Sequence, residues 1–404
     1  MKFAFGRFFR RICETFAPLG IPLVWLQLTA ERKRFLAALA GITFAVTMMM
    51  FQMGLNSALF SQVVAPLLQM RGDVILVNPQ FEYFGISRTF PQQRLYQAMQ
   101  VPGVVESAGI YVTNLSFKNP QTGRDRDVFI MAFDPMEKPF KNQQILSQQN
   151  RLKRDGVVLF DTLSRDEFGN IETLLAKNPP NEGGVRTEIH GRRASVEGVF
   201  QMGPTFAADG NILMGLDTYL QTLPGARSDQ IAVGLLTLKP GVSPESVVEQ
   251  LEKIMPPDVK VMTMQGFIAN EKAYWSERTP IGFVIGASMA VALIVGAVIV
   301  YQILYTDVTD HLPEYATLKS IGFQDAYFTG LVLKESFILS VLGFIPGTIL
   351  TAILYYLTRK LAFMPTYLTF ANICTVLLLT ILMCSLAGAL ATRKLRQADP
   401  AEIC

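Results

Sequence analysis

Long apolar segments constrain this sequence more than any other feature. Residues 35–59 and 281–305 carry no charged side chain, while 331–357 and 371–391 are charged only at Lys334 and Glu335. A helix of roughly 20 apolar residues crosses a bilayer core about 30 Å thick. Buried helices of a soluble protein are the alternative, which uncharged runs of this length disfavour. The sequence therefore predicts four transmembrane helices, and the first run begins too late and is too long for a cleaved signal peptide.

The remaining charge is concentrated between the first two apolar segments. Half of all residues are hydrophobic and 17% are charged, too apolar for an average soluble domain and too charged for a chain buried entirely in a membrane. Most charged residues lie in 60–278. The expected fold class is thus a membrane α-helical protein with four transmembrane helices and a large extracytoplasmic α+β domain between helices 1 and 2.

Basic residues near the helix ends predict the orientation. Lys and Arg outnumber Asp and Glu in residues 1–34, and the tail 392–404 carries Arg393, Lys394 and Arg396. Such residues favour the cytoplasmic side. We therefore expect a multi-pass protein of the plasma (inner) membrane with both termini in the cytoplasm. The connection 306–330 would also be cytoplasmic, whereas 358–370 would be an extracytoplasmic loop.

The N-terminal region has the pattern of an amphipathic helix. Its apolar residues recur at helical spacing: Phe5, Phe8, Phe9, Ile12 and Phe16. Arg7, Arg10 and Arg11 occupy the rest of the turn. Such a helix suits an anionic membrane surface, and packing on another subunit is the alternative.

The extracytoplasmic domain shows the same order of elements twice. Strand, helix and strand patterns follow one another in 73–113 and again in 230–264. Two such units side by side predict a ferredoxin-like part, about 70–114 and 229–266, with a mainly β part, about 115–228, inserted into it. Chance recurrence of a common motif is the alternative. The chain's four cysteines lie outside 60–278, so this domain would fold without a disulfide.

The sequence lacks the motifs of an enzyme. The dipeptide Gly-Lys never occurs, which excludes a phosphate-binding P-loop. The two histidines, His190 and His311, are far apart, and no pattern of metal ligands or of a catalytic nucleophile accompanies them. Glu335, beside Lys334, could relay protons, although extension toward the membrane surface or ion pairing is favoured. We therefore expect no enzymatic activity, metal or cofactor in this chain.

Two motifs carry a family resemblance. "LPEYATLKSIGF" follows the second apolar segment, and the chain ends in "RKLRQADPAEI". Together with the topology they resemble the MacB and FtsX type of ABC-transporter permease, which has the form E-x-x-x-L-K-x-[IL]-G after its second span and a basic segment followed by "DP-A-E" after its fourth. The matching residues are Glu314, Leu318, Lys319, Ile321 and Gly322, then Asp399, Pro400, Ala401 and Glu402. The N-terminal "PLVWLQLTAERKRFLAALAGITFA" is similar to the cyanobacterial DevC permeases.

The resemblance implies a set of partners. A permease of this type works as a homodimer with a separate ABC ATPase, a periplasmic adaptor (membrane fusion protein) and, through the adaptor, a TolC-like outer-membrane channel. DevC-type systems are linked to glycolipid export. Other functions stay open. One is an FtsX-like regulator of an external hydrolase, or a lipoprotein-releasing permease. Another is a membrane enzyme or sensor without an ATPase.

The segment 311–323 has the signals of a short helix. Pro313 and Glu314 suit its first turn, and Gly322 suits the left-handed position after its last. Leu318 and Ile321 fall on the side of Glu314. A helix this short needs a surface to lie on. With Tyr315 and Lys319 it would form the contact to the ATPase, and a plain connecting loop is the alternative.

Small residues and a proline mark helix contacts. Gly41 of the first apolar segment and Gly286, Ala290 and Gly296 of the second are expected to pack these helices against each other or against a second copy. Pro346, flanked by Gly343 and Gly347, is expected to kink the third helix.

Overall fold

The computed structural model describes residues 32–86, 88–204, 208–310, 322–361 and 364–392. The chain divides into two compact units. One consists of residues 1–58 together with 283–404, and the other of residues 59–282. The predicted fold class, apolar helices with an inserted α+β domain, is confirmed.

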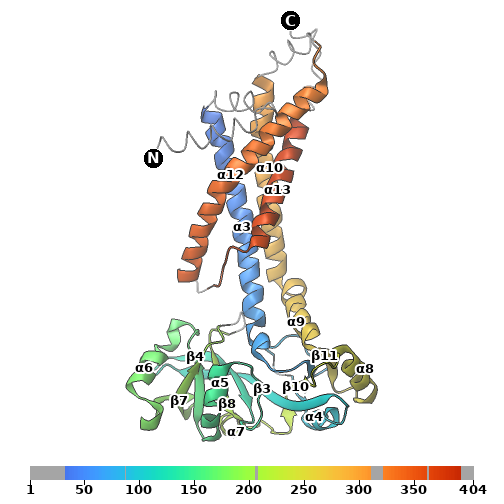
Figure 1. The fold of residues 1–404 in the computed structure, drawn as a ribbon. Coiled ribbons are helices and arrows are strands. Elements are labelled where there is room, and N and C mark those ends of the chain that lie inside the picture. Colours follow the sequence, from blue (N-terminus) through green and yellow to red (C-terminus); the bar gives the residue numbers. More distant parts are fainter. Residues whose placement is uncertain (1–31, 87, 205–207, 311–321, 362–363, 393–404) are drawn as a thin grey trace. The chain divides into compact units, whose positions relative to one another are not determined.

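The described part of the chain contains four helices that are long and apolar enough to cross a membrane (Figure 1). They are α3 (Arg32–Gln69), α10 (Pro280–Asp310), α12 (Asp325–Leu361) and α13 (Phe370–Ala391). The first three extend past the predicted apolar segments. α3 is the clearest case, since it continues to Gln69 and contains Pro66.

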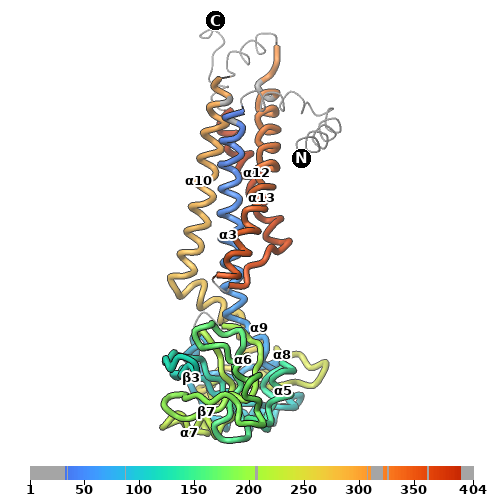
Figure 2. Tube along the Cα trace, turned by 90° about the vertical axis from the view of Figure 1, so that its left-hand side faces the viewer, coloured from blue at the N-terminus to red at the C-terminus, as the bar shows by residue number. Residues whose placement is uncertain are grey.

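The helices of the first unit share one apolar core. Figures 1 and 2 show α3, α10, α12 and α13 running alongside one another. Fully buried side chains come from each helix: Ile42, Val46, Val300, Val332, Leu339, Val376 and Cys384. Outward-facing residues such as Phe283, Ile294 and Leu386 remain exposed in the single chain, as expected for helices surrounded by lipid or by a partner.

Four antiparallel strands form one half of the outer sheet. Their order is β11-β1-β10-β3. The chain runs through two strand–helix–strand units, whose elements are β1 (Val74–Val77), α4 (Gln93–Ala98), β3 (Val104–Lys118), β10 (Val233–Leu238), α8 (Pro244–Ile254) and β11 (Lys260–Thr263). Because β10 lies between β1 and β3, the two units interleave in the strand order of a ferredoxin-like layer.

The other half of the sheet is of mixed direction. It continues from β3 in the order β4-β8-β5-β7-β6, in which β4 with β8 and β5 with β7 are parallel. These strands are β4 (Asp125–Phe133), β5 (Val157–Asp161), β6 (Val185–Ile189), β7 (Arg192–Phe200) and β8 (Asn211–Gly215). The short helices are α5 (Gln143–Gln148), α6 (Ile171–Lys177) and α7 (Leu216–Thr222). A separate ribbon joins β2 (Phe90–Pro91) to β9 (Gln230–Ile231).

Strand β3 joins the two halves. Its residues up to Ile110 pair with β10, and those from Tyr111 onward pair with β4. At the change of partner, the N–H of Gly109 donates to the Glu137 carboxylate over 2.8 Å. Because β4 pairs with β3 only from Tyr111 onward, the Glu137 carboxylate accepts the hydrogen bond of Gly109 in place of a neighbouring strand. The boundary expected near residue 115 therefore falls inside a strand, and the mainly β part continues the same sheet.

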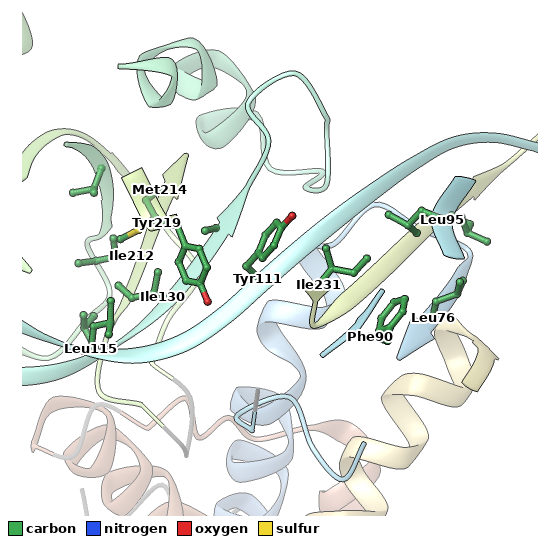
Figure 3. Packing of buried hydrophobic residues seen from close by; sticks show 14 of the residues in the cluster. Leu76, Phe90, Leu95, Tyr111, Leu115, Ile130, Ile212, Met214, Tyr219 and Ile231 are labelled. Atoms are coloured by element: carbon green, nitrogen blue, oxygen red, sulfur yellow. The ribbon is translucent and has the colours of Figure 1, made fainter. Parts of the chain in front are cut away.

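Apolar residues cover both faces of the sheet. Neighbouring residues of a strand point to opposite faces, so Leu76 joins one buried cluster and Ile75 the other. Figure 3 shows part of the first cluster, with Tyr111 between the residues of the two halves. The Tyr111 and Tyr219 rings lie 5.5 Å apart. The domain thus has a core of its own.

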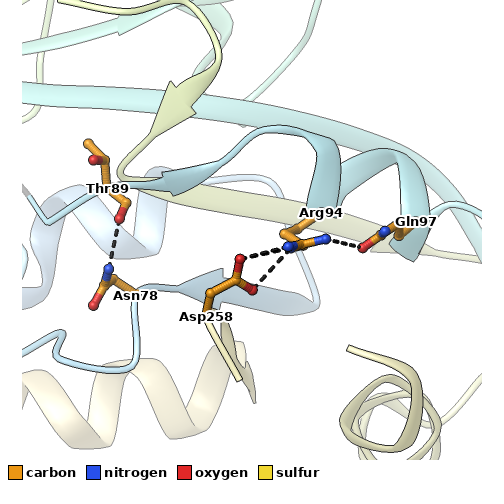
Figure 4. A network of polar contacts seen from close by, with 5 residues as sticks. All are labelled: Asn78, Thr89, Arg94, Gln97 and Asp258. Carbon is orange, nitrogen blue, oxygen red and sulfur yellow. Dashed lines mark hydrogen bonds and ion pairs between the residues drawn. The ribbon is translucent and has the colours of Figure 1, made fainter. Parts of the chain in front are cut away.

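Polar contacts fasten helix α4 to the rest of its half. The Arg94 guanidinium donates to both carboxylate oxygens of Asp258, just before β11, with a shortest distance of 2.7 Å (Figure 4). Arg94 also donates to Gln97, and Asn78 donates to the carbonyl of Thr89 over 2.7 Å. A bidentate pair of this kind fixes geometry as well as adding stability.

Candidate functional site in the transmembrane helix bundle

Two glycines of α12 bring it close to α3. A Cβ atom placed on Gly343 would lie 2.5 Å from Cγ2 of Ile42, and one placed on Gly347 would lie 2.7 Å from Cγ1 of Val46. The two glycines are four residues apart, so they lie on the same face of the helix. Such spacing lets the backbones of two membrane helices approach closely.

Hydrogen bonds accompany this contact. The hydroxyl of Thr43 donates to the carbonyl of Gly343, and that of Thr47 donates to the carbonyl of Gly347, both over 3.3 Å. Pro346 lies between these carbonyls and has no N–H to donate. Helix α12 nevertheless continues through Pro346. The two glycines predicted to assist a kink thus contact α3, and a bend at Pro346 stays a prediction.

Glycines also bring α3 and α10 together. A Cβ atom on Gly41 would overlap Ile299, and one on Gly296 would lie 2.6 Å from Cβ of Ala45. The first and second apolar helices therefore pack against each other at these two predicted positions.

The other two predicted packing residues lie elsewhere on α10. Gly286 and Ala290 are exposed in the single chain, and no atom lies within 4 Å of a Cβ placed on Gly286. They are four residues apart and therefore lie on the same face of α10.

Further contacts join the remaining helices. The hydroxyl of Tyr355, on α12, donates to the carbonyl of Met50 on α3. Gly388 of α13 lies against Ser336 of α12, where a Cβ atom would overlap the hydroxyl. These contacts were not predicted, although the spacing of small residues in α13 is a signal that could have indicated one of them.

Helix α3 consequently contacts both helices that flank the segment 311–321. It meets α10 at Gly41 and α12 at Gly343 and Gly347. Side chains pack directly on these glycines, and tightly packed interfaces of this kind deform little. This arrangement suits a bundle that transmits movement.

The predicted coupling residues lie mostly outside the described residues. These are Glu314, Tyr315, Leu318, Lys319 and Ile321. Gly322 is described, and its φ of 109° is in the region that favours glycine. Just after it, the exposed rings of Phe323 and Tyr327 lie 4.9 Å apart. Sequence reasoning missed this aromatic pair, although its four-residue spacing was readable.

Two further titratable residues, Glu335 and His190, lie in different units of the chain. Glu335 is 5% exposed within α12, so its side chain is packed inside the first unit. His190 is exposed in the turn between β6 and β7, with a φ of 50°. Within the described residues, no cluster of His, Cys, Asp or Glu could hold a metal ion.

Comparison with known proteins defines the class. The FtsX-like permease C-terminal family matches residues 286–400, and the MacB-like periplasmic core domain matches residues 35–254. The fold and both matches define an ABC-transporter permease, a subunit that is not itself the catalytic one and that operates with an ATPase partner. The chain belongs to the family with the MacB-like periplasmic core domain, within the MacB/FtsX type of permease.

Solved structures also resemble the chain. The periplasmic region of MacB from Actinobacillus actinomycetemcomitans is 11% identical, with a TM-score of 0.34, covering 49% of this chain and 91% of that one. The extracellular domain of YknZ, a noncanonic ABC-type transporter from Gram-positive bacteria, is 12% identical, with a TM-score of 0.31 and coverage of 47% and 98%. A permease domain from Porphyromonas gingivalis is 17% identical, with a TM-score of 0.30 and coverage of 49% and 91%. No curated protein matches the chain.

Proposed function

We propose that the chain is the permease subunit of an ATP-driven exporter for a lipophilic cargo such as a glycolipid. The observation that carries this proposal is the MacB-like periplasmic core domain matched over residues 35–254. The large two-part outer domain gives the exporter a surface for a periplasmic adaptor, through which cargo would reach an outer-membrane channel. The glycolipid class rests on the similarity of residues 22–45 to DevC permeases.

The ATPase would act through the segment 311–323. This segment connects α10 to α12, and both helices contact α3 at glycines. Leu318 would insert into a cleft of the ATPase, while Glu314 and Lys319 would pair with charges at its rim. Closure of the ATPase would then move α10 and α12, and α3 would follow. The orientation with both termini in the cytoplasm is part of this proposal.

The exporter is expected to contain two copies of the chain, in contact along α10. We expect that Gly286→Cys and Ala290→Cys, in a background without the native cysteines, form disulfide-linked dimers in membranes. The exposed small residues allow a close approach of two helices. Val300→Cys is the matched control, because Val300 is buried within its own chain. Dimer bands that are absent at 286 and 290, or equally strong at 300, would contradict this interface.

The proteins that copurify with the chain distinguish the exporter from the alternative functions. Affinity-tagged chain would be extracted in mild detergent, and copurifying proteins would be identified by mass spectrometry. We expect an ABC ATPase together with a periplasmic adaptor. Recovery of an ATPase with a cell-wall hydrolase and no adaptor would overturn the exporter, and recovery of neither an ATPase nor an adaptor would overturn the whole proposal.

A further inference from the structure

A π-helical turn precedes the second apolar helix. Helix α9 (Met264–Ala273) continues into the π turn η5 (Tyr274–Arg278), and α10 begins at Pro280. Turns of this kind are rare and are frequently found at functional sites. The chain then closes a tight corner, since a Cβ atom on Gly282 would overlap the carbonyl of Ser276. Only glycine fits there without a shift of the backbone.

A distant loop is bound to this helix by a buried carboxylate. Glu271, on α9, is 2% exposed. Its carboxylate accepts the backbone N–H of Phe84 over 2.8 Å and the indole N–H of Trp275 over 3.1 Å. One side chain thus bridges the loop 78–86 and the π turn. A buried carboxylate is stable only with such partners.

Aromatic rings reinforce the same bridge. Tyr83 of the loop stacks on Tyr274 of the π turn, with ring centroids 4.5 Å apart, and meets Trp275 edge-on at 5.3 Å. Phe81 packs against Phe267 of α9 at 5.2 Å. Asn270 donates to the carbonyl of Glu82 over 3.1 Å. The loop therefore contacts the helix along three consecutive turns.

We propose that the loop 78–86 is a latch that holds the π turn in its present conformation, with Glu271 as the group that closes it. Released from the loop, the π turn can revert to an α-helix or unwind. This proposal concerns the outer unit alone and does not depend on the exporter or its ATPase.

The ionisation of Glu271 gives the latch a pH dependence. Burial raises the pKa of Glu271 to about 7, although the hydrogen bonds from Phe84 and Trp275 act in the opposite direction. An open latch exposes the carboxyl and returns its pKa to the ordinary value near 4.5. The closed state therefore binds the proton more tightly, and its stability is fully present below about 4.5 and is lost as the pH rises through 7.

The surroundings assign this titration to Glu271. The titratable side chain that faces it from the loop is Tyr83, whose pKa burial raises above its ordinary value. The charged residues of the adjoining segments are all exposed: Glu82, Lys272, Glu277 and Arg278.

Hydrogen exchange in the full-length chain tests the latch. We expect Glu271→Ala to lower the protection of the amides in 79–86 by at least about tenfold at every pH, because two N–H donors lose their acceptor. In the native chain this protection should fall between about pH 4.5 and 7 and level off above, because the open state ionises first. Glu271→Gln keeps one acceptor without a charge, so its loop should stay protected and lose the pH dependence. Glu277→Gln, an exposed glutamate of the same turn, is the control and should behave as the native chain.

A second variant keeps the test valid if Glu271→Ala misfolds. Protection of β4 reports whether the sheet remains folded in each variant. If Glu271→Ala also exposes β4, Tyr83→Ala decides instead, with Tyr83→Phe as its ring-preserving control. Native protection of 79–86 in Glu271→Ala, or in a folded Tyr83→Ala, overturns the latch. A native pH profile in Glu271→Gln overturns the role of Glu271.

Discussion

Replacement of Leu318 by aspartate is expected to abolish both transport and ATPase copurification, while the chain still inserts in the membrane. Loss of a buried apolar anchor commonly costs about 2 kcal/mol or more of binding free energy, which corresponds to roughly 30-fold in affinity. A carboxylate placed in the same apolar cleft adds the cost of burying a charge. Copurification from mild detergent and transport in cells measure the two effects, and membrane fractionation verifies insertion.

Residues at the rim of the same segment supply matched comparisons. Glu314→Ala and Lys319→Ala should weaken ATPase binding only in part, and their effects should shrink at high salt because exposed charge pairs are screened. Phe323→Ala offers a third comparison, since this exposed ring belongs to the last residue of the segment and lies 4.9 Å from the ring of Tyr327. Intact ATPase binding and transport in Leu318→Asp would show that the segment 311–323 is not the coupling element.

The membrane helices were predictable because their signal is local. An uncharged run of about 20 residues has few alternatives to a membrane span, so the segments 281–305 and 371–391 fall within the observed α10 and α13. Helix ends were less predictable, since α3 continues through Pro66 to Gln69, past the end of the predicted apolar segment at residue 59. Hydropathy reports where lipid begins, whereas the end of a helix depends on caps and on tertiary contacts.

The outer domain was predictable in its repeated units but not in how they join. The strand–helix–strand patterns in 73–113 and 230–264 are visible from alternation and turn residues. The continuation of β3 across both halves of the sheet is not visible, because strand partners are set by contacts between residues distant in sequence. The hydrogen bond from the Gly109 N–H to the Glu137 carboxylate was unpredictable for the same reason, because nothing near Glu137 in the sequence indicates its partner.

The candidate site residues were likewise predictable only in part. Small residues could be recognised as positions of helix contact. Their partners could not, because the sequence of one helix does not show which other helix packs against a given face. Gly41 and Gly296 face neighbouring helices of their own chain, whereas Gly286 faces open space. Gly343 and Gly347 were grouped with Pro346 as a kink from their proximity in sequence, although their spacing of four residues also fits a close helix contact.

The contact of these two glycines with α3 gives the second large expected effect. Gly347→Leu should lower the free energy of unfolding of the detergent-solubilised chain by about 1 to 3 kcal/mol, the range for overpacking a close contact. Val46 cannot move away easily, because it is fully buried, and the carbonyl of Thr43 lies 3.1 Å from the new Cβ position. Titration with sodium dodecyl sulfate in mixed micelles measures the change.

Another glycine of the same helix is the matched control. No atom lies within 4 Å of a Cβ placed on Gly330, so Gly330→Leu should change the stability little. Equal destabilisation by the two variants would indicate a general effect of leucine in α12 and would contradict a specific contact with α3.

The two large effects should also differ in kind. Leu318→Asp removes the ATPase, whereas Gly347→Leu leaves the segment 311–323 unchanged and should retain ATPase binding. If movement passes from α12 to α3 through Gly343 and Gly347, the Gly347→Leu complex should hydrolyse ATP without transport. Loss of hydrolysis and transport in proportion would instead mean that α3 takes no separate part. Transport per ATP hydrolysed, measured in reconstituted membranes, therefore tests whether this helix contact carries the movement.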